Sequence, residues 1–153
     1  MVVASARVNL MPRNKSVYMG TTKIDPHQTA GEVTRELVRA GATSVNTDYH
    51  DGSIAGLRWI MRVGGKDVLF DMPIRVEPVL ELLGGRDVKQ AERVAWRQLL
   101  RWVQAQNAMI AMKMVDPAEV YLAYVVADQS TGKTLYSQLL GNGFKQLAAP
   151  GVG

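Results

Sequence analysis

Three arginines recur at every fourth position in the stretch ERVAWRQLLRWVQAQNAMIAMKM, residues 92–114. They are Arg93, Arg97 and Arg101, and because an α-helix turns once in 3.6 residues, this spacing places them on one side of a helix. Guanidinium groups bind phosphates through paired hydrogen bonds, so the row is a candidate surface for a polyanion. The other interpretation is a row that is solvated or packs inside the molecule. The carboxylates considered for such packing are Glu77, Glu81 and Glu119.

The N-terminal end of the chain carries the excess positive charge. The net charge is +4, and the four cations that precede the first acidic residue, Asp25, are Arg7, Arg13, Lys15 and Lys23. The other 14 basic residues (18 − 4) equal the 14 acidic ones in number, so the rest of the chain is neutral. Residues 1–15 are predicted to be a flexible basic arm that contacts phosphates. A solvated terminal tail is the alternative interpretation.

One cluster of side chains has the residue types of a metal or acid–base site. Asp48, His50 and Asp51 lie close together, and along a strand residues 48 and 50 share a face. The chain has no cysteine and only one other histidine, His27, so no third ligand is anchored nearby. A polar turn is the favoured interpretation. We therefore predict no metal site, no catalytic residue and no cofactor.

The sequence STGKT, residues 130–134, has the ending of a phosphate-binding loop. The full pattern requires a glycine at position 127, where this chain has Ala127, and a strand before the loop. A helix is predicted before it instead. An ordinary loop that ends in a helix cap is the favoured interpretation.

Two runs of alternating apolar residues predict a β-hairpin over residues 56–76. These residues are Leu57, Trp59 and Met61 before the turn, and Val68, Phe70 and Met72 after it. A two-residue turn at Gly64–Gly65 places Val63 opposite Lys66 and gathers the apolar residues on one buried face. The same register sets two ion pairs on the outer face, Arg62 with Asp67 and Arg58 with Asp71.

Caps and helical periodicity predict the remaining elements. They are a strand over 16–24, a helix over about 29–40 capped by Thr29, a strand before the 50–52 turn, a short helix after Pro78, a long helix from Asp87 to about 115, a helix over 117–127 and a last short helix. The fold class is therefore α+β: one small domain over residues 16–147, ordered β-α-β-β-β, followed by a C-terminal group of helices packed on a curved antiparallel sheet. Residues 148–153 are predicted to be a disordered tail. The residues predicted to be buried are Trp59, Phe70, Met72, Trp96, Leu100 and Val103.

A second, narrower apolar stripe on the long helix is formed by Trp102 and Met109. It lies off the core face, so another element must cover it. Two copies that meet across a two-fold axis would do so and would form a homodimer. Tyr121, Tyr124 and Leu135 of the same chain are the alternative cover.

The sequence AWRQLLRWVQAQNAMIAMKMVDPAEVYLAYVVADQSTGKTLYSQL, residues 95–139, resembles a widespread group of small uncharacterised proteins of tailed phages and prophages. The likeness includes TAGEVTRELVRAGATSV, residues 29–45, and covers about residues 21–140. It implies a phage origin and action in the cytoplasm of a bacterial host. It implies no activity, so no functional residue is carried over from it.

Together these patterns predict a non-enzymatic phage accessory protein that binds nucleic acid. The predicted contacts are Arg7, Arg13, Lys15, Lys23, Arg93, Arg97 and Arg101. The alternative is an anti-defence or host-takeover binder that docks on a bacterial protein through Trp102 and Met109, or sequesters a nucleotide signal. No apolar run approaches the roughly 18 residues of a membrane span, so no membrane partner is expected.

Overall fold

In the computed structural model, which describes residues 17–151, the first helix, α1, spans Pro26–Arg39. Its N-cap is Asp25, whose side chain accepts a hydrogen bond from the His27 backbone N–H at 2.8 Å. The predicted start at Thr29 is therefore wrong. Thr29 lies one turn inside the helix and is fully buried, because an aspartate cap followed by a proline at the first helical position starts the helix earlier.

The predicted first strand is not formed in the described part of residues 16–24. Residues 18–21 form turns, in which the Gly20 N–H bonds to the Val17 carbonyl at 2.8 Å and the Thr22 N–H bonds to the Met19 carbonyl at 3.0 Å. Backbone groups that are satisfied locally in this way are not available for a sheet. The order of elements thus begins with a helix and not with a strand.

The sheet has three antiparallel strands in the order β1-β2-β3: β1 spans Ala42–His50, β2 spans Ser53–Val63 and β3 spans Lys66–Pro73. The predicted hairpin register is confirmed throughout, from Val63 opposite Lys66 to Leu57 opposite Met72. Gly64 and Gly65 both have positive φ, 56° and 79°, which a type I′ turn requires at its two central residues.

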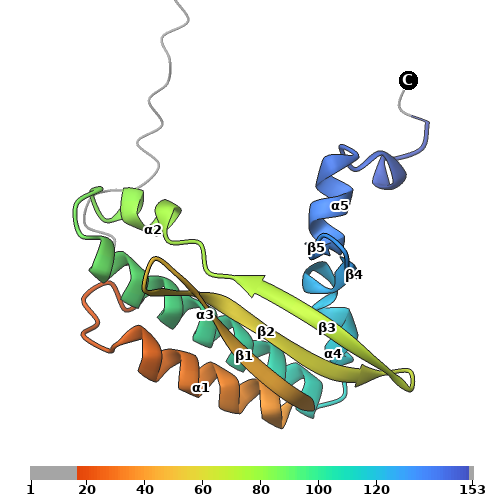
Figure 1. The fold of residues 1–153 in the computed structure, drawn as a ribbon, viewed down its shortest axis with the longest axis horizontal. Coiled ribbons are helices and arrows are strands. Elements are labelled where there is room, and N and C mark those ends of the chain that lie inside the picture. Colours follow the sequence, from red (N-terminus) through yellow and green to blue (C-terminus); the bar gives the residue numbers. More distant parts are fainter. Residues whose placement is uncertain (1–16, 152–153) are drawn as a thin grey trace, which may run out of the picture.

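Two helices lie side by side across one face of this sheet (Figure 1). They are α1 and the long helix α3, Val88–Ala111, which is capped as predicted by the Asp87 side chain. A short helix, α2, Glu77–Leu82, precedes α3 and is followed by Gly84 and Gly85. The predicted end of α3 near 115 is too late. Lys113 has φ 59° and the Met114 N–H bonds to the Met109 carbonyl at 3.0 Å, a left-handed turn that ends the helix.

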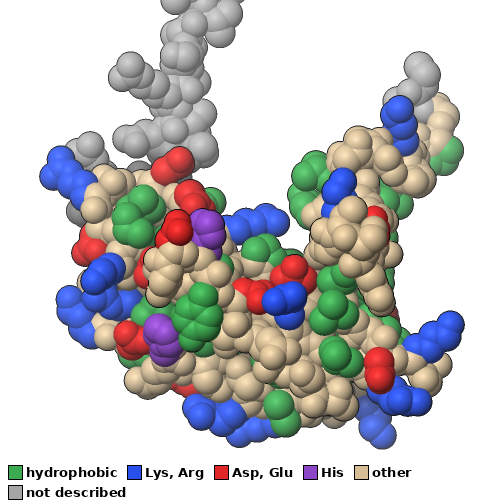
Figure 2. Space-filling view, viewed as in Figure 1, with side chains coloured by type: hydrophobic (Ala, Val, Ile, Leu, Met, Phe, Trp, Pro, Cys, Tyr) green, Lys and Arg blue, Asp and Glu red, His purple; other side chains and the backbone are tan. Residues whose placement is uncertain are grey.

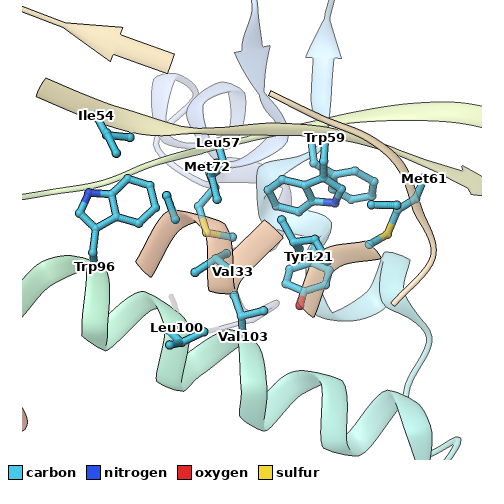
Figure 3. Close-up of a cluster of buried hydrophobic side chains, with 14 residues drawn as sticks. Val33, Ile54, Leu57, Trp59, Met61, Met72, Trp96, Leu100, Val103 and Tyr121 are labelled. Atoms are coloured by element: carbon cyan, nitrogen blue, oxygen red, sulfur yellow. The ribbon is translucent and has the colours of Figure 1, made fainter. Parts of the chain in front are cut away.

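The core lies between the sheet and the two helices (Figure 3). The Trp59 and Phe70 rings stack at 5.1 Å between centroids, and Tyr121 meets Trp59 edge-on at 5.4 Å. The prediction for the core is confirmed. All six residues expected there are buried: Trp59, Phe70, Met72, Trp96, Leu100 and Val103.

The C-terminal elements are shorter and more varied than predicted. They are α4 (Pro117–Val120), the 3₁₀ turn η1 (Leu122–Tyr124), β4 (Val126–Asp128), β5 (Lys133–Thr134), α5 (Leu135–Gly141) and η2 (Lys145–Leu147). The single helix expected over 117–127 ends at Val120, because Val125 forms a β-bridge with Phe70 of β3. STGKT supplies part of the β4–β5 loop and all of β5, so it follows a short strand and not the helix expected before it. Thr134 caps α5 by accepting a hydrogen bond from the Ser137 N–H.

The outer face of the sheet is not covered by any helix of residues 17–151 (Figure 1). Figure 2 looks onto this face and shows it hollowed between α2 and the C-terminal elements, with Lys and Arg interspersed among Asp and Glu. Within the same residues, no helix has the length and hydropathy that crossing a lipid bilayer would require. The fold is therefore α+β in one domain, with helices on one face of a small antiparallel sheet.

Candidate nucleic-acid interface

The side of α3 that carries the arginine row faces α1 and the chain before it. Arg97 is held inside this contact: its Nη1 lies 3.0 Å from the Glu32 Oε1 and 3.4 Å from the Thr29 Oγ1. The side chains of Arg97 and Glu32 are only 15% and 25% exposed. The charge of Arg97 is thus balanced within the molecule by Glu32 of α1, which was not among the carboxylates considered from the sequence.

Two glutamines on the same helix bind the chain that precedes α1. The Gln90 Nε2 donates to the carbonyl oxygens of Gly20 and Thr22, at 2.9 and 3.0 Å. The Gln98 Nε2 donates to the Tyr18 carbonyl at 2.7 Å. Side-chain amides that bond to backbone carbonyls fix the path of a segment that has no secondary structure of its own. Residues 17–24 therefore lie along α3.

Arg93 and Arg101 flank Arg97 and have no carboxylate partner among the described residues. The Arg93 Nη1 donates to the Gln90 Oε1 at 3.1 Å. The Arg101 guanidinium carbon lies 4.3 Å from the centroid of the Tyr18 ring, a cation–π contact that leaves the positive charge in place. Arg101 is exposed and Arg93 half-buried.

Lys23 is exposed on the same segment, between Thr22, whose carbonyl Gln90 binds, and α1. We use the name basic seam for Lys23, Arg93 and Arg101, the exposed or half-exposed cations where residues 17–24 meet α3. Acidic groups are close to one end of it: Arg93 and Lys89 line a hollow of about 240 Å³ together with Asp25 and Glu92. The pKa of Asp25 is lowered mainly by the His27 backbone N–H, and the charge of Arg93 adds to this.

The remaining predicted contacts, Arg7, Arg13 and Lys15, lie outside the described residues. The described chain begins at Val17, one residue before Tyr18, whose ring lies against Arg101. The sequence that holds these three cations is therefore joined to the molecule at the basic seam.

The predicted interface residue Trp102 is half-buried against the chain's own C-terminal part. Its ring meets Tyr121 and Tyr124 edge-on, at 5.6 and 6.0 Å between centroids. Met109 is also half-buried. The sequence left open whether a second copy or tyrosines of the same chain cover Trp102. Tyr121 and Tyr124 contact it, so a second copy is not needed at this residue.

The residues considered for metal or acid–base chemistry are used in other ways. The Asp48 carboxylate accepts three hydrogen bonds from Arg58, and the His50 Nε2 lies 3.3 Å from an oxygen of Asp51, with both side chains exposed. Within residues 17–151, no three side chains of the metal-binding types gather into a site. Asp48 and His50 belong to β1, and only Asp51 lies in the turn that follows it.

Sequence reasoning missed three residues that shape the surroundings of the basic seam: Tyr18, Gln98 and Glu32. Tyr18 lies in a segment that was assigned to a strand, and the glutamine amides bind backbone oxygens, which leave no pattern in a sequence. Comparison of the chain with models of protein families, with curated proteins and with solved structures finds no match. The function must therefore be argued from the geometry of the residues.

Proposed function

We propose that this chain is a non-catalytic protein that binds nucleic acid through its phosphates, without reading base sequence. The contacts are the basic seam, Lys23, Arg93 and Arg101, together with Arg7, Arg13 and Lys15. Arg97 is left out because Glu32 neutralises it. The site of action is the cytoplasm of a bacterial host, which the resemblance to phage proteins implies.

The contact between Tyr18 and Arg101 carries this proposal. It joins the sequence that holds most of the net positive charge to Arg101 of α3, which, like Arg93, has no carboxylate partner among the described residues. Arg93 and Arg101 are eight residues apart, which is about 12 Å along a helix. Cations at this spacing can follow a phosphate backbone, and such contacts supply affinity without sequence information.

The arrangement of aromatic side chains also favours backbone contacts over base contacts. Proteins that bind single strands stack bases on exposed aromatic rings. Tyr18, the aromatic residue at the basic seam, already lies against Arg101. Trp59, Trp96 and Phe70 are in the core. Binding should therefore depend steeply on salt and weakly on base sequence.

The experiment is a salt titration of binding to random-sequence duplex DNA and to a single strand. On duplex DNA each phosphate contact contributes about 0.9 to the slope of log affinity against log salt. The triple variant Lys23→Gln, Arg93→Gln, Arg101→Gln should lower the magnitude of that slope by about 2.7. The triple variant Arg7→Gln, Arg13→Gln, Lys15→Gln should lower it by a similar amount.

The matched control neutralises three exposed cations elsewhere, Arg35→Gln, Lys66→Gln and Lys113→Gln. It changes the net charge equally and should leave the slope almost unchanged. Equal effects of the control and of the seam variant would mean that net charge alone attracts DNA. No binding at low salt would end the proposal.

A further inference from the structure

The strand β1 forms a free edge of the sheet. Among residues 17–151 only β2 pairs with it, and no other strand of these residues pairs with the backbone groups on its other side (Figure 1). No hydrogen bond to the backbone of residues 43–49 comes from another described segment outside the sheet. An edge strand of this kind is a template for pairing with another chain, because a row of N–H and C=O groups points outward.

Soluble proteins usually protect such edges, and β1 lacks most of the protection. Its sequence, ATSVNTDYH, contains no proline, lysine or arginine. Its one acidic side chain, Asp48, is bound by Arg58 of β2. Register shifts occur only between Ala42 and Ser44 and between Asp48 and Tyr49. Residues 44–48 are therefore a regular, open strand between two irregularities.

This stretch is complementary to itself in the antiparallel direction. In an antiparallel pair, residues directly opposite each other have their side chains on the same face of the sheet. Two copies related by a two-fold axis meet this condition only if the axis passes through a residue, and not midway between two residues. An axis at Asn46 gives the full overlap. It sets Ser44 opposite Asp48, Val45 opposite Thr47 and Asn46 opposite itself.

Each of these pairs is favourable. A serine hydroxyl can donate to the aspartate that faces it, and two asparagine amides can bond to each other. Val45 and Thr47 pair with Trp59 and Leu57 on the core side of the sheet, where β-branched residues pack well against each other. No like charges meet in this register.

The helix beneath β1 offers a side of small, uncharged residues. Glu32 and Glu36 of α1 bond to α3, so Gly31, Thr34 and Val38 lie on the side of α1 away from α3. That side is near the free edge, because the rings of His27 in α1 and Tyr49 in β1 lie 6.0 Å apart. A Cβ added at Gly31 would meet nothing within 4 Å.

Two exposed apolar side chains mark the two ends of this surface. Val38 is 55% exposed and lies where α1 leads into β1, and Tyr49 is 60% exposed at the other end of β1. In an antiparallel pair the start of one β1 meets the end of the other. Val38 of one copy would therefore approach Tyr49 of the other, and both would lose contact with water.

We infer that β1 is the interface for a second copy of this chain, which pairs antiparallel about Asn46 and extends the sheet to six strands. The occupant is a second copy because the register that fits is a self-pairing one. This inference does not depend on nucleic-acid binding, since the basic seam lies on the other side of α1, along α3. It also differs from the dimer expected at Trp102, which is covered within the chain.

A single-cysteine crosslink tests the register, because the chain has no cysteine of its own. In the paired state two Asn46→Cys residues face each other at about 4.5–5.5 Å between Cα atoms, within disulfide range. The matched control is Ser44→Cys, on the same strand and face. Its two copies would lie about 13 Å apart, beyond disulfide range. Mild oxidation should crosslink the first variant and leave the second as monomer.

Sedimentation provides the independent measurement. The wild type should sediment at twice the 16.8 kDa of one chain at micromolar concentration. Asn46→Lys should lose the dimer while keeping its fold, and mixing it with Asn46→Asp should restore a mixed dimer. A monomeric wild type, or equal crosslinking of Asn46→Cys and Ser44→Cys, would overturn the inference.

Discussion

Arg58 in the central strand binds Asp48 of β1, and not Asp71, which lies directly opposite it on β3. The Arg58 Nη2 is 2.6 Å from the Asp48 Oδ1, and the Nε donates to both oxygens of the same carboxylate. Asp71 is left half-buried with no hydrogen-bond partner among the described side chains. Its pKa is raised, first by burial and then by Asp48, while Arg58 partly offsets this.

The two aspartates beside Arg58 should therefore respond oppositely to the same substitution. Because the pKa of Asp71 is higher in the folded protein than in the unfolded chain, the ionised carboxylate destabilises the folded state. The stability that the neutral carboxyl group contributes at low pH is therefore lost as pH rises. Asp71→Asn should raise the free energy of unfolding at pH 7, and Asp48→Asn should lower it by about 0.5–1 kcal/mol. Urea unfolding of both variants at pH 7 and pH 4 is the measurement. Equal losses at pH 7 would contradict the assignment.

The ion pair between Arg97 and Glu32 should contribute to stability, because both side chains are largely removed from water. Arg97→Met and Glu32→Leu should each cost about 1–3 kcal/mol, since each leaves a partly buried charge without its partner. The double variant should cost less than the sum of the two. Chemical unfolding of the four proteins measures the coupling. The exposed pair Arg62–Asp67, at 3.5 Å, is the control and should show coupling below about 0.5 kcal/mol.

Alkaline pH should destabilise the protein through Tyr121. Burial, with Glu36 nearby, raises the pKa of this phenol from 10.0 to about 12. The unfolded chain loses the proton first, so the free energy of unfolding should fall between pH 10 and pH 12, by about 2–3 kcal/mol in total. The difference between wild type and Tyr121→Phe isolates this residue from the other tyrosines. A difference that stays constant over that interval would be the contrary result.

Trp102 should matter for stability and not for association. Its ring is half-buried between Tyr121 and Tyr124, so Trp102→Ala should cost about 1–3 kcal/mol, less than a fully buried tryptophan. Trp102→Phe should cost less, because it keeps an edge-on partner for both tyrosines. Sedimentation should show the same mass for all three proteins. A variant that is fully stable but changes from dimer to monomer would restore the interface first expected at this residue.

Local patterns predicted the elements whose signals agree with one another. The 56–76 hairpin is the clearest case, since apolar alternation, a Gly-Gly turn and cross-strand charges all specify one register, which the fold has. The Asp87 cap of α3 was predicted for the same reason. Where two signals compete within a few residues, as Asp25–Pro26 and Thr29–Glu32 do, a boundary is harder to predict.

By itself, then, the sequence determined the fold class, the hairpin register and the buried face of α3, because these follow from periodicities of 2 and 3.6 residues along the chain. Only the tertiary structure decided what the other side of α3 touches. Arg97 reaches Glu32 across 65 residues of sequence, and Gln98 reaches the Tyr18 carbonyl across 80. The partners of Trp102 and the free edge of β1 were decided in the same way. A polar row on a helix looks alike whether it faces water or another segment, since the contacts that distinguish the two cases join residues far apart in the chain.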